Sequence, residues 1–120
     1  MNSVRKSDSE SGRGKGVSLS CDACRLPIKT ASEGWLEWII SDKGSGYGFR
    51  VCHKEPIGEG RKSCQAYSNV PGPRGVHLLA LVGDQGIKEM VDILIQYGSN
   101  RVSWGRMFLR LLEGGLFMEV

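Results

Sequence analysis

Four cysteines and a histidine in the first half of the chain have the residue types and spacing of metal ligands. Cys21 and Cys24 form a C-x2-C pair, and Cys52, His53 and Cys64 follow further along the chain. A tight pair of cysteines followed by a second pair of Cys or His ligands is typical of a structural zinc site, in which the protein fills all four positions. The sequence therefore predicts one structural Zn²⁺, bound by Cys21, Cys24, Cys64 and a fourth ligand.

The fourth ligand is either His53 or Cys52. Neighbouring residues in a strand point to opposite faces, so both side chains cannot easily reach one ion. Alternation places His53 on the same face as Phe49 and Val51, toward the expected core, which favours a Cys3His site. The preference of structural zinc for thiolates favours Cys52, and a β-bulge at the strand end would exchange the two. We predict His53, with Cys52 as the alternative.

The cellular setting decides between metal ligands and disulfides. The first 16 residues hold Ser, Gly and charged side chains without the apolar segment of a secretory signal, and no apolar run approaches the ~20 residues that span a bilayer. We therefore expect a cytoplasmic, reducing location and no membrane partner. In that setting four cysteines are metal ligands more often than disulfides.

The sequence offers no convincing catalytic arrangement beside these ligands. His53-Lys54-Glu55 matches the H-x-E of zinc deaminases, but in that family H-x-E precedes the cysteine pair, whereas here it follows. A site closed by four protein ligands supports folding and leaves no position for a substrate. The prediction is a non-enzymatic protein without an evident small-molecule substrate.

Composition and charge indicate one ordinary globular domain. The chain has 120 residues, 40% of them hydrophobic and 24% charged, with a formal net charge of +3. The basic excess is spread between the N-terminal residues and the cysteine-containing half, so no region is as basic as a dedicated phosphate-binding surface usually is. Nucleic acid is therefore the second choice of partner.

A polar tail and a β-hairpin surround the ligands in the predicted order of elements. Residues 1–17, rich in Ser and Gly with a small basic excess, are predicted to be a disordered tail. Aromatic and β-branched residues over 34–40 and alternation over 47–53 predict two strands, joined by a turn over 41–46. One face of the second strand is expected to carry Tyr47, Phe49, Val51 and His53.

Helical periodicity follows the segment 71–75, which is rich in Pro and Gly. A short apolar helical turn is predicted over 76–82. An amphipathic helix is predicted over 85–97, with Asp84 as its N-cap and Gly98 as its C-terminal glycine. The expected inward side chains of this helix are Ile87, Met90, Val91 and Leu94.

A last helix is expected to have Ser103 as its N-cap, with Trp104, Met107, Phe108, Leu111 and Leu112 inward. Three short helices bury too little apolar surface to balance the entropy of ordering them alone. We therefore predict an α+β fold, in which a zinc-stapled, zinc-ribbon-like β-hairpin packs with a C-terminal three-helix segment. Residues 18–120 would form one domain, with a zinc and hairpin part over 18–67 and a helical part over 74–115.

Three sequence segments resemble those of small bacterial zinc-binding proteins of the zinc-ribbon and treble-clef group, whose function is uncharacterised. The resemblance covers about residues 21–67 and implies zinc binding without implying an activity. A regular ribbon has a second C-x2-C pair, from which the wide spacing here departs. The matching segments are Cys21-x2-Cys24, Gly34-Trp35-Leu36-Glu37-Trp38 and Phe49-Arg50-Val51-Cys52-His53.

The functional prediction is a zinc-stabilised interaction module. We expect it to bind a protein partner as an adaptor, regulator or inhibitor, of the kind that phages and other mobile elements encode. The alternative is a nucleic-acid-binding regulatory protein that uses the zinc hairpin and the C-terminal helices, with Arg106 and Arg110 as reading residues. The residues expected to contact either partner are Trp35, Trp38, Arg50, Lys54, Arg61 and Lys62.

Overall fold

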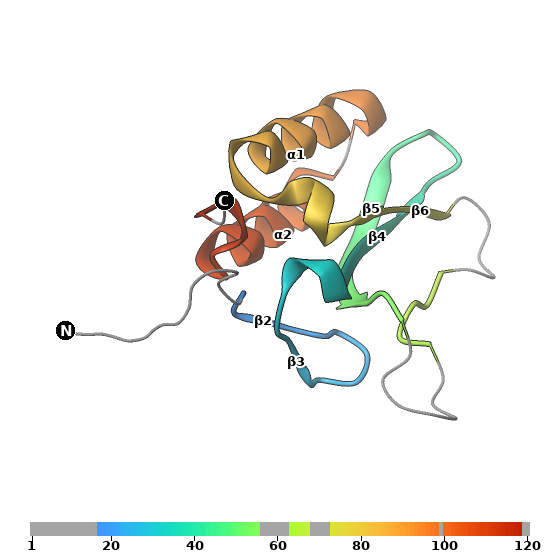
Figure 1. Cartoon of the computed structure of the whole chain (residues 1–120). Coiled ribbons are helices and arrows are strands. Elements are labelled where there is room, and N and C mark those ends of the chain that lie inside the picture. Colours follow the sequence, from blue (N-terminus) through green and yellow to red (C-terminus); the bar gives the residue numbers. More distant parts are fainter. Residues whose placement is uncertain (1–16, 56–62, 68–72, 99, 119–120) are drawn as a thin grey trace.

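Two antiparallel sheets followed by two C-terminal helices form the structure (Figure 1). The computed structural model describes residues 17–55, 63–67, 73–98 and 100–118. Short 3-10 helices, labelled η, connect the larger elements. In chain order the elements are β2 Leu19–Ser20, β3 Pro27–Ile28, η1 Ala31–Glu33, β4 Gly34–Ile40, β5 Gly46–His53, β6 Pro73–His77, η2 Leu78–Leu81, α1 Gly83–Tyr97, α2 Arg101–Glu113 and η3 Leu116–Met118.

The predicted hairpin is confirmed as the centre of a larger sheet. β4 pairs antiparallel with β5 on one edge and with β6 on the other, giving the order β5-β4-β6. A separate two-stranded sheet, β2-β3, holds the C-x2-C pair in its turn. Figure 1 shows this small sheet beneath the larger one, close to the end of β5.

A β-bulge in β5 changes the predicted alternation. Glu37 lies opposite Arg50 and Ile39 lies opposite Tyr47, so β5 has one residue more than β4 between these pairs. Gly48 occupies the bulge with φ of 66°, a left-handed conformation that favours glycine. The prediction that Tyr47 shares a face with Phe49 and Val51 is therefore wrong, because the extra residue transfers Tyr47 to the face of Glu37.

The two faces of the sheet have different coverings. On the helix face, Trp38 is buried, stacks on Phe49 at 5.5 Å between ring centroids, and meets Tyr97 of α1 edge-on at 5.9 Å. On the opposite face, the segment 63–67 crosses the sheet, and the backbone N–H of Ala66 donates to Glu37 at 2.8 Å. The aromatic cluster thus fixes the helices on one side while hydrogen bonds fix the ligand-bearing segment on the other.

The predicted three-helix segment is wrong in its first helix. Residues expected to form a helical turn over 76–82 instead complete β6 and then form η2. A seven-residue helix is too short to be stable without packing. The open edge of β4 offers backbone partners, and the register pairs Val76 with Leu36 and His77 with Trp35. Two α-helices, α1 and α2, therefore follow the sheet.

The second predicted helix exists, but it is rotated from the expected orientation. The buried side of α1 is formed by Gly86, Met90 and Ile93. A Cβ on Gly86 would clash with the carbonyl oxygen of Leu81, so η2 packs directly on the helix at this glycine. The close approach moves the predicted inward residues Ile87 and Val91 outward, and they are 37% and 39% exposed.

The last helix begins two residues before its predicted cap. Asn100 is the N-cap of α2, and its side-chain oxygen accepts from the backbone N–H of Ser103 at 3.0 Å. Met107 is buried as predicted, and the indole N–H of Trp104 donates to the Met90 carbonyl oxygen at 2.8 Å. This hydrogen bond joins α2 to α1. The prediction that Leu112 faces inward is wrong, because its side chain is 44% exposed.

The two sheets and the helices share one hydrophobic core, so the described residues form a single compact α+β domain. Val17, assigned above to the tail, is 8% exposed and belongs to this core, and the rest of the predicted tail lies outside the described residues. The backbone N–H of Ser18 donates to the carbonyl oxygen of Gly114 at 2.8 Å. In the described part of the chain, no helix has the length and hydropathy needed to cross a bilayer.

Candidate metal centre

The C-x2-C pair forms a tight knuckle between β2 and β3. The backbone N–H groups of Ala23 and Cys24 point at the Cys21 sulfur, with nitrogen–sulfur distances of 3.3 and 3.4 Å. Arg25 follows in the left-handed region with φ of 68°, which turns the chain back toward β3. This local geometry directs two sulfurs to one side of the turn and surrounds one of them with donors that stabilise a thiolate.

His53, the last residue of β5, supplies a nitrogen to the same place. Its Nδ1 lies 3.4 Å from the sulfur of Cys24, and its Nε2 lies 3.1 Å from the carbonyl oxygen of Pro27. A carbonyl only accepts, so Nε2 carries the proton and Nδ1 keeps a free lone pair. Metal-binding histidines are usually held in this way, through a hydrogen bond from the nitrogen that does not bind the metal.

Cys64 reaches the cluster from the segment that crosses the sheet. Its sulfur lies 4.0 Å from Nδ1 of His53, and its carbonyl oxygen accepts from Arg50 at 3.1 Å. Arg50 Nε lies 3.1 Å from a carboxylate oxygen of Glu37, without the alignment of a hydrogen bond. Arg50 therefore holds the Cys64 carbonyl, and Glu37 holds the Ala66 N–H two residues further on, so the pair fixes the backbone that follows the Cys64 side chain.

The four side chains Cys21, Cys24, His53 and Cys64 form the cluster that the sequence predicted. Their ligand atoms all lie within 4.8 Å of one another. Ligands arranged tetrahedrally at zinc–sulfur and zinc–nitrogen bond lengths would be separated by roughly 3.5–3.8 Å, so small adjustments suffice. All four cysteines are free thiols, and the cluster is compatible with a bound metal ion.

The thiols of this cluster differ in their ease of ionisation. Burial alone would raise the pKa of Cys21, but the backbone N–H groups of Cys24 and Ala23, together with His53, outweigh it and lower the pKa to about 6. Burial, joined by hydrogen bonding and negative charge from Cys21 and Cys24, raises the pKa of Cys64 to about 11. Three thiolates this close repel one another, and a divalent cation would remove that penalty.

Cys52, the alternative fourth ligand, lies outside the cluster. It is fully buried and lies opposite Trp35 in the register, on the other face of the sheet from His53. Burial, and then the negative charge of Glu37, raises its pKa to about 12. Cys52 is therefore a protonated core side chain, and His53, the residue favoured by alternation along β5, is the member of the pair that joins the cluster.

Asp22 connects the knuckle to both the sheet and the last helix. Its carboxylate accepts from the backbone N–H of Val51 at 2.7 Å, and its own N–H donates to the carbonyl oxygen of Val51 at 2.7 Å. Arg110 of α2 donates to both carboxylate oxygens at 3.1 and 3.0 Å and to the Ser20 carbonyl oxygen at 3.1 Å. Asp22 thus occupies the middle of the C-x2-C pair and bonds to two distant elements.

Sequence reasoning missed Asp22 and the buried acid Glu37. A single acidic residue within the apolar strand 34–40 is a signal that could have been used, because a buried carboxylate requires a partner. No comparable signal in the sequence identifies Asp22. The guanidinium group of Arg110, predicted above to be a reading residue for nucleic acid, pairs with Asp22 in the structure.

The residues predicted to contact a partner differ in their exposure and in the contacts that they make. Trp38 is core, Arg50 is engaged with Glu37, and Trp35 is half-buried with its ring lying across Gly75. Lys54 is partly exposed beside the metal cluster. Trp38 and Arg50 are thus engaged within the fold, and the other two members, Arg61 and Lys62, lie outside the described residues.

Comparison with family models, curated proteins and solved structures gives no match. The resemblance to zinc-ribbon proteins therefore stays a prediction. The Cys3His cluster itself is present, and it suggests a zinc-binding site.

Proposed function

We propose that this chain binds one structural Zn²⁺ through Cys21, Cys24, His53 and Cys64, and that it acts as a non-enzymatic interaction module. The observation that carries the proposal is the convergence of four protein ligands at one point. Four protein ligands complete a tetrahedron and leave no position for a substrate or a reactive water, which is the difference between structural and catalytic zinc. The ion would then stabilise the fold.

The position of the cluster supports a stabilising role. Its ligands come from the knuckle, from the end of β5 and from the segment 63–67, which lie far apart in the chain. An ion bound there would crosslink all three, and structural zinc contributes on the order of 10 kcal/mol to the folding of small domains. That is comparable with the whole stability of an ordinary domain.

Exposed apolar side chains on α1 support a protein partner. Ile87, Val91 and Ile95 are spaced four residues apart and lie along one side of the helix, and Ile95 is 74% exposed. An amphipathic helix with an uncovered apolar row fits a hydrophobic groove on another protein. The partner we propose is therefore a protein with an apolar groove, and the adaptor or regulator role follows from such binding.

Elemental analysis of the purified protein tests the metal part. We expect one zinc per chain, and a cobalt-substituted form should have the absorption of a tetrahedral site with three sulfurs and one nitrogen. Less than stoichiometric metal after purification without chelator would contradict the proposal. A cobalt spectrum showing a bound water would instead indicate an open, catalytic site.

Affinity purification from the native host tests the partner, with the double variant Val91→Lys/Ile95→Lys as the probe. The two charges should abolish capture of a protein that the unmodified chain retains. The double variant Gln85→Lys/Gln96→Lys is the matched control, because it adds the same two charges at exposed positions on another side of α1. Equal capture by both variants would contradict the α1 surface, and recovery of nucleic acid whose binding weakens steeply with salt would favour the alternative function.

A further inference from the structure

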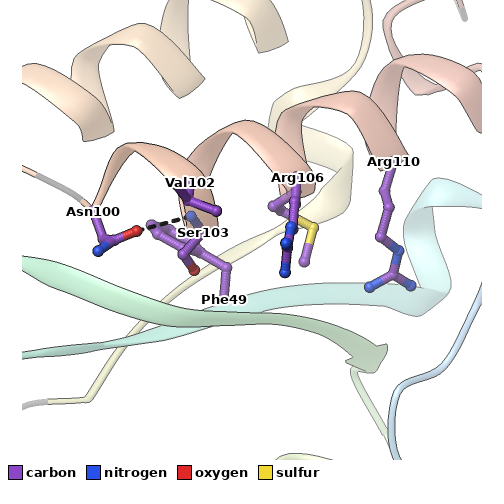
Figure 2. A pocket seen from close by; sticks show the side chains of 7 residues that line it. Phe49, Asn100, Val102, Ser103, Arg106 and Arg110 are labelled. Carbon is purple, nitrogen blue, oxygen red and sulfur yellow. Dashed lines mark hydrogen bonds between the residues drawn. The ribbon is translucent and has the colours of Figure 1, made fainter.

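A cavity lies between the first turns of α2 and the strand β5. Its volume is about 390 Å³, in the lower part of the range for pockets that bind small organic molecules. Figure 2 shows Arg106 and Arg110 extending from α2 toward β5, with Phe49 near the start of the helix. The residues that line the cavity are Phe49, Asn100, Val102, Ser103, Arg106, Met107 and Arg110.

The lining carries positive charge and has no acidic side chain. Asp22 balances the charge of Arg110 from outside the cavity, with the carboxylate 3.0 Å from the guanidinium. Arg106 is exposed and has no ion-pair partner among the described residues. Ser103 and Asn100 add a hydroxyl and an amide. The net charge of the cavity is therefore that of one unpaired guanidinium beside neutral hydrogen-bonding groups.

The rest of the lining is apolar and firmly held. Phe49 is stacked on buried Trp38, which fixes the plane of its ring, and Met107 is almost fully buried. A ring with one face packed on the core and an edge at the cavity gives a preformed apolar wall. The cavity thus combines a preformed apolar wall with the unpaired guanidinium of Arg106.

We propose that this cavity binds a small organic anion. Its carboxylate or phosphate group would pair with the guanidinium of Arg106, whose planar fork matches either group. The apolar part of the ligand would lie against Phe49 and Met107. None of the lining residues is a ligand of the metal cluster, so the site stands independently of the function proposed above.

Titrations of the zinc-loaded full chain, followed by ¹H–¹⁵N NMR, test this site with three probes of similar shape. Phenyl phosphate and phenylacetate carry the two anionic groups, and phenylacetamide is the neutral counterpart of the second. We expect at least one anion to shift the amides of Phe49 and of the first turns of α2 saturably, while phenylacetamide does not. The stronger of the two anions identifies the preferred charged group.

Arg106→Ala should weaken binding of that anion by about tenfold or more, the range for loss of a charge-assisted hydrogen bond. Arg101→Ala is the matched control, because Arg101 is exposed on the same helix and does not line the cavity. Arg106→Gln serves the same purpose if the alanine variant folds poorly. The proposal is overturned if neither anion produces saturable shifts, if phenylacetamide binds equally well, or if the Arg106 and Arg101 variants have the same affinity.

Discussion

Replacing Asp22 by alanine should weaken both the fold and the metal centre, although Asp22 is not a metal ligand. The change removes the acceptor of the Val51 N–H, a buried strand group, and the partner of Arg110. Loss of the backbone bond costs about 1–2 kcal/mol. The ion pair is partly exposed, with side chains 29% and 37% accessible, so it adds only about 0.5–1 kcal/mol. The total expected loss is about 1.5–3 kcal/mol.

Urea unfolding of the zinc-loaded protein measures this loss, and competition with a chromophoric chelator measures zinc affinity in the same samples. Loss of a group that orients metal ligands weakens metal binding by about 10–100-fold, and we expect a loss of that order here because Asp22 fixes the turn that carries Cys21 and Cys24. Asp42→Ala is the matched control, because Asp42 is an exposed residue in the turn between β4 and β5. A loss below about 0.5 kcal/mol with unchanged zinc affinity, or equal effects of the two variants, would refute the assignment of Asp22.

Three further predictions concern the metal and the packing of the helices. Chelation of the metal should unfold the zinc-loaded chain, seen as a loss of circular dichroism, and an unchanged spectrum would contradict a stabilising ion. His53→Ala should lose stoichiometric zinc, whereas Cys52→Ala should retain it in elemental analysis; the reverse result would restore Cys52 as the ligand. Gly86→Ala should lower the free energy of unfolding by about 2 kcal/mol or more, because its Cβ would meet the Leu81 backbone. Gly105→Ala has open space around it and should raise the free energy of unfolding by about 0.5–1 kcal/mol. Urea unfolding measures both, and equal effects of the two variants would contradict the close packing at Gly86.

The metal cluster could be predicted because its signals are local. The C-x2-C spacing dictates a knuckle, and strand alternation decides between two adjacent residues, His53 and Cys52. The same alternation failed at Tyr47, because the bulge at Gly48 depends on a left-handed backbone conformation that glycine permits without requiring. Local sequence patterns therefore predicted the structure correctly at the knuckle and at His53, and failed at Tyr47, where the pattern fits more than one backbone conformation.

The parts that could not be predicted depend on contacts between distant segments. Residues 73–77 form the strand β6 because the edge of β4 is available for pairing. The sequence of this segment gives no sign that β4 is its partner. The orientation of α1 is set by the close approach of Leu81 to Gly86. Likewise the Asp22–Arg110 pair joins residues that are 88 positions apart, and only the assembled fold brings them together.

The long separation of Asp22 and Arg110 has a consequence during synthesis on the ribosome. The knuckle emerges well before α2, yet the Asp22 carboxylate bonds to that helix, and Ser18 bonds to Gly114 in the same region. Contacts so distant in sequence form late in folding, because closing a long loop is entropically costly. A nascent chain that lacks α2 would hold the proposed ion weakly and exchange it readily, so firm retention of the ion would follow only after α2 has been made and packed.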